Sequence, residues 1–159
     1  MKPRIYIETT VISYLSSRPA RDLRSAARQE WTHDFWLWAK EFVDLFTSEL
    51  TRIEAGCGDS EAAAKRLAYA DVCTVIEETE AARKLSKQLI EHKAIPSTEP
   101  EDALHFAIAT LAKMDYVASW NFSHLVGEQP KRQLSQVLQK LGYAVPMLAT
   151  PESLLESLK

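Results

Sequence analysis

Three acidic side chains and one amide stand beside predicted strands of this chain, at positions where they could bind a metal ion. Glu8 directly follows an apolar run, residues 5–7, and ends it with a charge. Glu54 lies in the helix expected after a second strand, and Asp102 lies in the first turns of a later helix. Asn121 follows a fourth strand. Because ligands of open α/β sheets bind at the carboxyl ends of the strands, we expect the four side chains to converge there.

Carboxylates gathered in this way favour a divalent cation. Like charges held close together repel, so some of the acids stay protonated unless a cation neutralises them. Mg²⁺ and Mn²⁺ prefer oxygen ligands, and Mg²⁺ keeps several of its waters. A metal ion held by such acids can produce a hydroxide nucleophile and stabilise charge on a phosphate. The pattern therefore predicts metal-dependent hydrolysis of phosphodiester bonds.

Strand and helix signals alternate along the chain and predict the frame that positions these residues. Short apolar or β-branched runs predict five strands, at residues 5–7, 44–47, 72–76, 116–119 and 144–148. Helical spacing predicts helices at residues 9–15, 23–42, 49–56, 61–70, 78–93, 100–113, 130–141 and 152–158. The expected N-terminal caps are Thr9 or Thr10, Ser48, Asp59 or Ser60, and Thr98 or Glu99. This alternation favours a single domain, residues 1–159, of the three-layer α/β/α class with a mainly parallel central sheet of about five strands.

Composition and charge narrow the range of functions. A chain of 159 residues can bury a real core, and its net charge of −3 argues against a broad basic surface that coats nucleic acid. A small nucleic-acid site with local basic residues is compatible with that charge. Cys57 and Cys73 are too few and too far apart for a disulfide framework or a zinc knuckle, so we expect plain thiols in a reducing cytosol. Neither a signal peptide nor a membrane span is expected, and the protein is predicted to be cytoplasmic.

Four segments, taken together in this order, resemble the PIN-domain family over nearly the whole chain. They are residues 5–15 (IYIETTVISYL), residues 47–50 (TSEL) with Glu54, residues 101–109 (EDALHFAIA) and residues 119–125 (SWNFSHL). Within the family, the chain looks most like the VapC-like toxin ribonucleases of type II toxin–antitoxin pairs. The resemblance implies a compact PIN-like fold, Mg²⁺ or Mn²⁺ in an acidic pocket, and cleavage of single-stranded RNA. It also implies an antitoxin protein as a partner and, together with the aromatic helix described below, a homodimer.

The resemblance assigns roles to six residues. Glu8, Glu54 and Asp102 match the metal-binding acids of the family, and Asn121 matches its fourth polar position. The small hydroxyl residues that support the metal shell in the family are matched by Thr10 and Ser119.

Two positions depart from the family pattern. Glu8 stands where Asp is usual, and its extra methylene moves a ligand oxygen by roughly an ångström, a displacement that can cost much activity. Asn121 stands where Asp is frequent, and it can coordinate a metal without adding charge. The site is therefore less negative, and a second metal ion would bind more weakly. A catalytically weakened PIN-fold module that binds RNA or a protein partner is thus the alternative to a metal-dependent endoribonuclease.

Each candidate also has an ordinary structural interpretation. Glu8 and Asp102 can act as acids that interact favourably with a helix dipole. Glu54 can be a solvated helix residue, since Glu49 lies nearby, and Asn121 can be a turn residue after a strand.

Two histidines stand close to the candidates. His105 lies three residues after Asp102 on the same helical face, so we expect a packed or hydrogen-bonded supporting residue rather than a base. His124 lies in the loop after Asn121, where it is either a phosphate contact or a loop cap.

The helix predicted at residues 23–42 carries an aromatic stripe and follows a basic segment. The stripe, expected in the core, consists of Trp31, Phe35, Trp38 and Phe42. Trp36 falls off this stripe and, if exposed, marks an interface with a second copy or an antitoxin helix. The basic segment is either a phosphate-contacting arm or a solvated face, and it contains Arg18, Arg21, Arg24 and Arg28.

Overall fold

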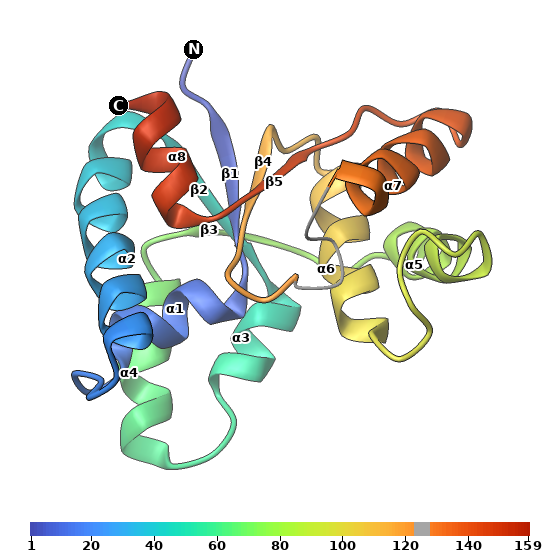
Figure 1. The fold of residues 1–159 in the computed structure, drawn as a ribbon. Coiled ribbons are helices and arrows are strands. Elements are labelled where there is room, and N and C mark those ends of the chain that lie inside the picture. The colour runs from blue at the N-terminus through green and yellow to red at the C-terminus, as the bar shows by residue number, and fades with distance from the viewer. Residues whose placement is uncertain (123–127) are drawn as a thin grey trace.

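A five-stranded, wholly parallel sheet forms the centre of the protein (Figure 1). The computed structural model describes residues 1–122 and 128–159. The strands are β1 (Arg4–Ile7), β2 (Asp44–Ser48), β3 (Thr74–Ile76), β4 (Tyr116–Ala118) and β5 (Met147–Ala149). Their order across the sheet is β3-β2-β1-β4-β5. This arrangement confirms the predicted mainly parallel sheet of about five strands.

Helices lie between the strands in sequence and cover both faces of the sheet (Figure 1). They are α1 (Thr9–Ser16), α2 (Leu23–Phe42), α3 (Glu49–Ala55), α4 (Ser60–Ala70), α5 (Glu80–Glu91), α6 (Pro100–Leu111), α7 (Glu128–Lys140) and α8 (Pro151–Leu158). One hydrophobic core packs α5, α6 and α7 against the sheet, and a second packs α1, α2 and α8 against its other face. The protein therefore has the three-layer α/β/α architecture that the alternating pattern predicted.

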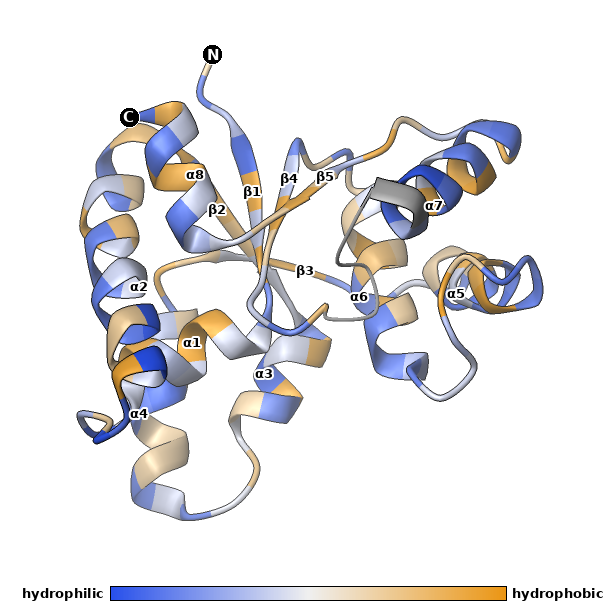
Figure 2. Ribbon diagram, viewed as in Figure 1, coloured by the Kyte–Doolittle hydropathy of each residue, from blue (hydrophilic) through white to orange (hydrophobic). Residues whose placement is uncertain are grey.

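The central strand β1 shows why an unbroken apolar run predicted this sheet. Ile5, Tyr6 and Ile7 have no solvent-exposed surface, although their side chains alternate between the two faces. Ile5 and Ile7 belong to the core beneath α1 and α2, while Tyr6 belongs to the core beneath α6. Strands of parallel sheets that are covered on both faces need apolar residues at every position. The colouring of Figure 2 shows this apolar character in the central strands.

The chain reverses its direction of travel across the sheet at β1. From β1 it proceeds through β2 to β3 on one side, and it later returns to add β4 and β5 on the other side. The register pairs Ile7 with Ala118, so β1 and β4 end at the same level. Crevices form at such reversal points, at the carboxyl ends of the strands, and ligands of α/β proteins bind there.

The structure decides between alternatives for two aromatic residues of α2: Trp36 does not meet the condition for an interface, and the core placement of Phe42 is wrong. Trp36 is buried, because its ring packs edge-on against Tyr69 of α4 at 5.9 Å between centroids. It therefore marks no exposed interface. Phe42 is 54% exposed, since it ends the helix, where its ring stacks on Trp38. Phe35, by contrast, is fully buried as expected.

Several predicted boundaries shift because turns occupy the ends of the apolar runs. Strand β3 begins at Thr74 rather than Val72, which is half exposed in a turn. Strand β5 begins after Pro146, a residue that has no N–H to donate to a ladder. Helix α6 starts after Glu99, but the side chain of that residue makes no capping hydrogen bond. Among the described residues, no helix is both long and apolar enough to cross a membrane.

Candidate functional site

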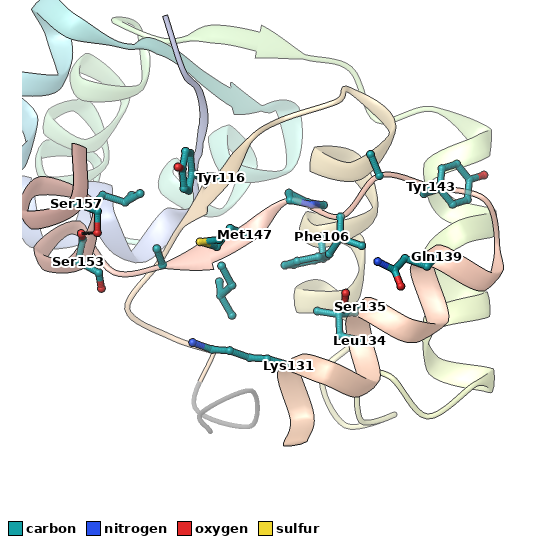
Figure 3. A pocket seen from close by; sticks show the side chains of 16 residues that line it. Phe106, Tyr116, Lys131, Leu134, Ser135, Gln139, Tyr143, Met147, Ser153 and Ser157 are labelled. Atoms are coloured by element: carbon teal, nitrogen blue, oxygen red, sulfur yellow. Dashed lines mark hydrogen bonds between the residues drawn. The ribbon is translucent and has the colours of Figure 1, made fainter. Parts of the chain in front are cut away.

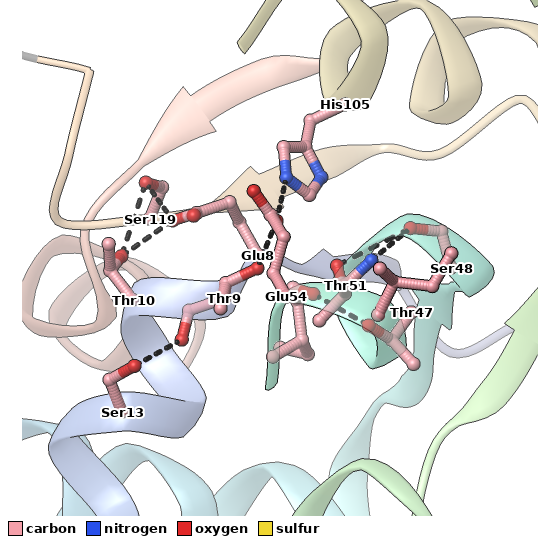
Figure 4. Close-up of polar contacts among 12 residues, drawn as sticks. Glu8, Thr9, Thr10, Ser13, Thr47, Ser48, Thr51, Glu54, His105 and Ser119 are labelled. Atoms are coloured by element: carbon pink, nitrogen blue, oxygen red, sulfur yellow. Dashed lines mark hydrogen bonds and ion pairs between the residues drawn. The ribbon is translucent and has the colours of Figure 1, made fainter. Parts of the chain in front are cut away.

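Glu8 is a buried carboxylate at the junction of β1 and α1. Its backbone N–H donates to the carbonyl of Ala118 at 3.1 Å, which continues the β1–β4 ladder. The side chain is 3% exposed, and its Oε1 accepts hydrogen bonds from the hydroxyls of Thr10 and Ser119, both at 2.6 Å. Figure 4 shows these two hydroxyls meeting at the carboxylate. The predicted hydroxyl residues are thus in direct contact with the first predicted acid.

The hydroxyls of Thr10 and Ser119 are oriented by the backbone that follows β4. The N–H of Trp120 donates to Thr10 Oγ1 at 2.9 Å, and the N–H of Asn121 donates to Ser119 Oγ at 3.0 Å. A hydroxyl has one proton, so an oxygen that accepts a backbone N–H turns its own proton to Glu8. The prediction that Thr9 or Thr10 caps α1 is wrong, because their hydroxyls donate to carboxylates instead and Glu8 occupies the cap position.

Glu54 comes to the same end of the sheet on α3. Its Oε1 accepts a hydrogen bond from the Thr9 hydroxyl at 2.6 Å and lies 2.6 Å from His105 Nε2. Burial by itself raises the pKa of Glu54, but the hydrogen bond and positive charge of His105, with help from Thr9, outweigh burial and lower it. Glu49, the nearby alternative, is exposed. Of the two acids on α3, only Glu54 therefore faces the other candidates.

His105 joins Glu54 to a buried tyrosine that the sequence pattern did not identify. Its Nδ1 lies 2.6 Å from the hydroxyl of Tyr6, which in turn lies 2.7 Å from Ser48 Oγ and 3.3 Å from Thr51 Oγ1. Tyr6 is fully buried in β1, and burial raises the pKa of its hydroxyl. The sequence did offer a signal for this contact, namely a tyrosine in an otherwise apolar strand. A buried tyrosine hydroxyl usually needs a hydrogen-bond partner.

Asp102 lies in the first turn of α6 and is 6% exposed. Burial raises the pKa of its carboxyl to about 6, and the negative charges of Glu8 and Glu99 act in the same direction. Glu54 makes a smaller contribution of the same sign, while the positive charge of His105 opposes it. The carboxyl of Asp102 is therefore in the electrostatic field of the other two predicted acids.

Asn121, the fourth predicted site residue, is less closely connected to the other candidates. Asn121 is exposed, and its described hydrogen bond is made by its backbone to Ser119. His124, predicted in the loop that follows, lies outside the described residues. The contacts therefore connect Glu8 with Thr10 and Ser119, and they connect Glu54 with His105.

The chemistry of these donors fits a hard divalent cation. All three acids offer oxygen atoms, and the pKa of Asp102 is raised first by burial and then by the negative charges of Glu8 and Glu99, which a cation would neutralise. In the described part of the chain, no three His, Cys, Asp or Glu side chains are gathered closely enough to hold a metal ion by themselves. Mg²⁺, however, is usually bound through one or two carboxylates with several waters. Glu8 and Asp102 suit that mode. Glu54 meets Thr9 and His105 at its Oε1, just as Glu8 meets Thr10 and Ser119 at its own Oε1.

A second hollow lies away from the carboxylates. It has a volume of about 690 Å³ and runs beside β5, between α7 and α8 (Figure 3). Its lining includes Phe106, Lys131 and Met147 and none of the predicted site residues. We therefore place the candidate site at the carboxyl ends of β1 and β4 rather than in this hollow.

Comparison with known proteins supports the fold. No protein-family model and no curated protein matches the sequence. A chain in the structure of VapBC2 from Rickettsia felis, bound to a DNA fragment from its promoter, aligns with a TM-score of 0.60 and 10% identity, over 92% of this chain and 97% of that one. VapC20 of Mycobacterium tuberculosis, a toxin that cleaves the sarcin-ricin loop, aligns with a TM-score of 0.52 and 19% identity, over 88% and 96% respectively. The chain therefore has the PIN-like α/β/α fold that these VapBC and VapC structures share.

Proposed function

We propose that the protein is a metal-dependent endoribonuclease. The observation that carries this proposal is the acidic cluster at the reversal point of the sheet, where Glu8 and Asp102 are buried and the charges of Glu8 and Glu54 act on Asp102. Sites with strongly perturbed pKa values are candidates for function. The likeness in fold to a toxin that cleaves RNA supports the same activity.

In this proposal the neighbouring residues orient the acids. Thr10 and Ser119 fix one oxygen of Glu8, which leaves the other for a cation, and His105 holds Glu54 in place. Asn121 provides a further polar group at the rim. When bound, Mg²⁺ or Mn²⁺ would activate water for attack on the phosphorus and offset the negative charge of the phosphate. A direct attack by water involves no covalent intermediate on the protein.

We further propose that the 159 residues act as one domain and as the toxin of a type II toxin–antitoxin pair in the cytoplasm. The likeness in fold to a chain of VapBC2, which was crystallised with a DNA fragment from its promoter, supports this role. By analogy, an antitoxin protein would bind this chain, and the chain would form a homodimer. Co-expression with the product of an adjacent gene, followed by size-exclusion chromatography, tests both partners.

Cleavage of a mixed-sequence, single-stranded RNA with Mn²⁺, Mg²⁺ or EDTA tests the activity. We expect cleavage with either metal and none with EDTA. Asp102→Asn should abolish cleavage without unfolding the protein, because the amide keeps the shape of the carboxyl and removes its charge. The variant is purified in parallel, which controls for a contaminating nuclease. Full activity in the variant would reject the assignment of Asp102.

A weakened binding module on the same fold is the second candidate, favoured by the exposed, uncharged Asn121 and by the Glu at position 8. The double variant Glu8→Asp with Asn121→Asp distinguishes the two candidates. A large gain in cleavage would indicate a weakened or lapsed enzyme. Absence of cleavage in both proteins, combined with retained RNA binding, would indicate a binding function.

A further inference from the structure

A partly exposed arginine contacts two aromatic side chains close to the acidic cluster. The guanidinium carbon of Arg28 lies 5.3 Å from the centre of the Trp120 ring, and its Nη1 lies 3.5 Å from the hydroxyl of Tyr14. The rings of Tyr14 and Trp120 meet edge to face at 6.0 Å. These residues come from α2, α1 and the segment after β4. With Thr32, they are called the Arg28 cluster below.

The Trp120 ring in this cluster is held by a buried hydrogen bond. Its Nε1 donates to Thr32 Oγ1 at 2.9 Å, and Thr32 has no exposed surface. Thr32 lies one turn after Arg28 on α2, so the same helix face carries both the acceptor for the indole N–H and the cation over its ring. A planar guanidinium on an indole is a favourable cation–π arrangement, which limits the positions that Arg28 samples.

The Arg28 cluster is continuous with the acidic cluster. The backbone N–H of Trp120 donates to Thr10 Oγ1 at 2.9 Å, and that hydroxyl donates to Glu8 Oε1 at 2.6 Å. Ser119, the preceding residue, also donates to Glu8. Two hydrogen bonds therefore separate the backbone of Trp120 from the carboxylate, so the Arg28 cluster is linked to Glu8 through Thr10.

Arg28 lacks a negative partner of its own. In the described part of the chain it forms no ion pair, and the contact with Tyr14 is its single hydrogen bond to a side chain. Among the described residues, the other three arginines of the basic segment also form no ion pair; they are Arg18, Arg21 and Arg24. Arg24 precedes Arg28 by four residues and shares its helix face. A guanidinium offers a fork of donors that suits phosphate oxygens, and phosphate contacts position nucleic-acid strands.

From these contacts we infer that Arg28, seated on Trp120 and Tyr14, binds a backbone phosphate of a single-stranded RNA next to the bond that is cut. The inference rests on the proposed ribonuclease function and adds a substrate-positioning residue to it. It also favours the phosphate-contacting interpretation of the basic segment, because Arg28 is partly buried against Trp120 and Tyr14 instead of belonging to a uniformly solvated surface. A flanking phosphate contact strengthens binding of substrate and transition state alike, so its loss raises KM more than it lowers kcat.

Binding of a short, fluorescein-labelled, single-stranded RNA tests this inference by fluorescence anisotropy in Mg²⁺. All proteins in the assay carry Asp102→Asn, so the RNA stays intact. We expect Arg28→Gln to raise Kd roughly tenfold, the loss typical of one charge-assisted hydrogen bond. The slope of log K against log salt should become shallower by about 0.7, the value for one phosphate contact on a single strand. Arg28→Lys, which keeps the charge without the fork, should bind more weakly with an unchanged slope.

Arg132→Gln is the matched control, because it removes an equal charge from an exposed position of α7, beyond the opposite face of the sheet. It should bind RNA like the parent protein. Binding within twofold of the parent by both Arg28 variants would overturn the inference and leave Arg28 to another ligand, such as an acidic protein segment. If the wild-type protein cleaves RNA in that case, the proposed function stands. If the wild-type protein neither binds nor cleaves RNA, the proposed function fails and the inference fails with it.

Discussion

At the scale of single residues, His105 is the group on which two parts of the site depend. Both of its ring nitrogens lie 2.6 Å from an oxygen, one in Glu54 and the other in Tyr6. The carboxylate of Glu54 can only accept, so Nε2 carries a proton and donates it. The ring is thereby fixed in one orientation, and Glu54 is held toward the pocket. A histidine with both nitrogens engaged in this way supports a ligand better than it serves as a free base.

Tyr6→Phe tests the buried half of this network. The variant keeps the ring but leaves His105 Nδ1 and Ser48 without their shared partner. An unsatisfied buried polar group costs about 1–3 kcal/mol, so we expect the free energy of unfolding to fall by about that amount. Urea denaturation measures it. Tyr69→Phe is the control, since the structure gives the Tyr69 hydroxyl no hydrogen bond among the described residues, and it should change stability by less than about 0.5 kcal/mol. Equal effects of the two variants would contradict the network.

Asp102 makes the stability of the metal-free protein depend on pH in a defined direction. Its pKa rises from an ordinary 3.8 to about 6 in the folded protein, so the native state holds this proton more tightly than the unfolded chain does. The resulting stabilisation is complete below about pH 4 and is lost as the pH rises through 6. Asp102→Asn cannot ionise. It should therefore be more stable than the wild type at pH 7.5, by at most about 3 kcal/mol, because one pKa unit corresponds to about 1.4 kcal/mol.

Thermal unfolding between pH 4 and pH 8 measures this difference. Asp34→Asn, an exposed position on α2, is the control and should follow the wild-type profile. Added Mg²⁺ or Mn²⁺ should raise the Tm of the wild type and leave that of Asp102→Asn nearly unchanged, since ligands stabilise only a state that binds them. Parallel pH profiles for wild type and Asp102→Asn would show that the carboxyl is not destabilised by its surroundings.

At the scale of elements, the site depends on two direct junctions between a strand and a helix. Only Glu8 separates β1 from α1, and α3 begins immediately after β2 at Ser48. The two strands are neighbours, with Tyr6 opposite Phe46, so the hydroxyl of Tyr6 reaches Ser48. Ser48 also accepts the N–H of Thr51 and thereby caps α3, as predicted. One serine thus sets both the start of the helix that carries Glu54 and a link to His105.

Ser48→Ala tests this junction. Loss of an N-cap usually costs about 1 kcal/mol, and the loss of the bond to Tyr6 should bring the total to about 2 kcal/mol or more. Cleavage should fall as well, because α3 carries Glu54. Asp59→Ala removes the side-chain cap of α4, which accepts the N–H of Ala62 at an exposed position. That control should lose about 1 kcal/mol and keep full cleavage. A loss of activity shared by both variants would point to general destabilisation.

At the scale of the whole molecule, the sequence sufficed for the fold class but not for the order of the strands. The run at residues 5–7 and the β-branched segments revealed five strands, because apolar periodicity is a local property. The reversal at β1 and the pairing of Ile7 with Ala118 depend on contacts between distant segments, which periodicity does not encode. The burial of Trp36 could not be predicted for the same reason, since its ring packs against Tyr69 on another helix.

For the candidate site too, the sequence revealed individual residues but not the contacts between distant segments. Glu8 and Asp102 could be selected because charges at the ends of apolar elements are conspicuous in a sequence. The contacts that surround them could not, since Ser119 lies 111 residues from Glu8 and Tyr6 lies 99 residues from His105. Arg28 illustrates the limit most clearly. Its spacing placed it in a basic segment, but only the positions of Trp120 and Tyr14 give that one arginine a defined location.

The reversal of the chain at β1 also has a consequence for biosynthesis. The candidate site is assembled from segments that leave the ribosome far apart in time: Glu8 and Glu54 are made early, whereas Asp102 and Ser119 emerge later. A nascent chain that ends before residue 119 contains β1 without all of its pairing with β4 and lacks the Ser119 hydroxyl that donates to Glu8. The candidate site is therefore incomplete until that late segment has folded.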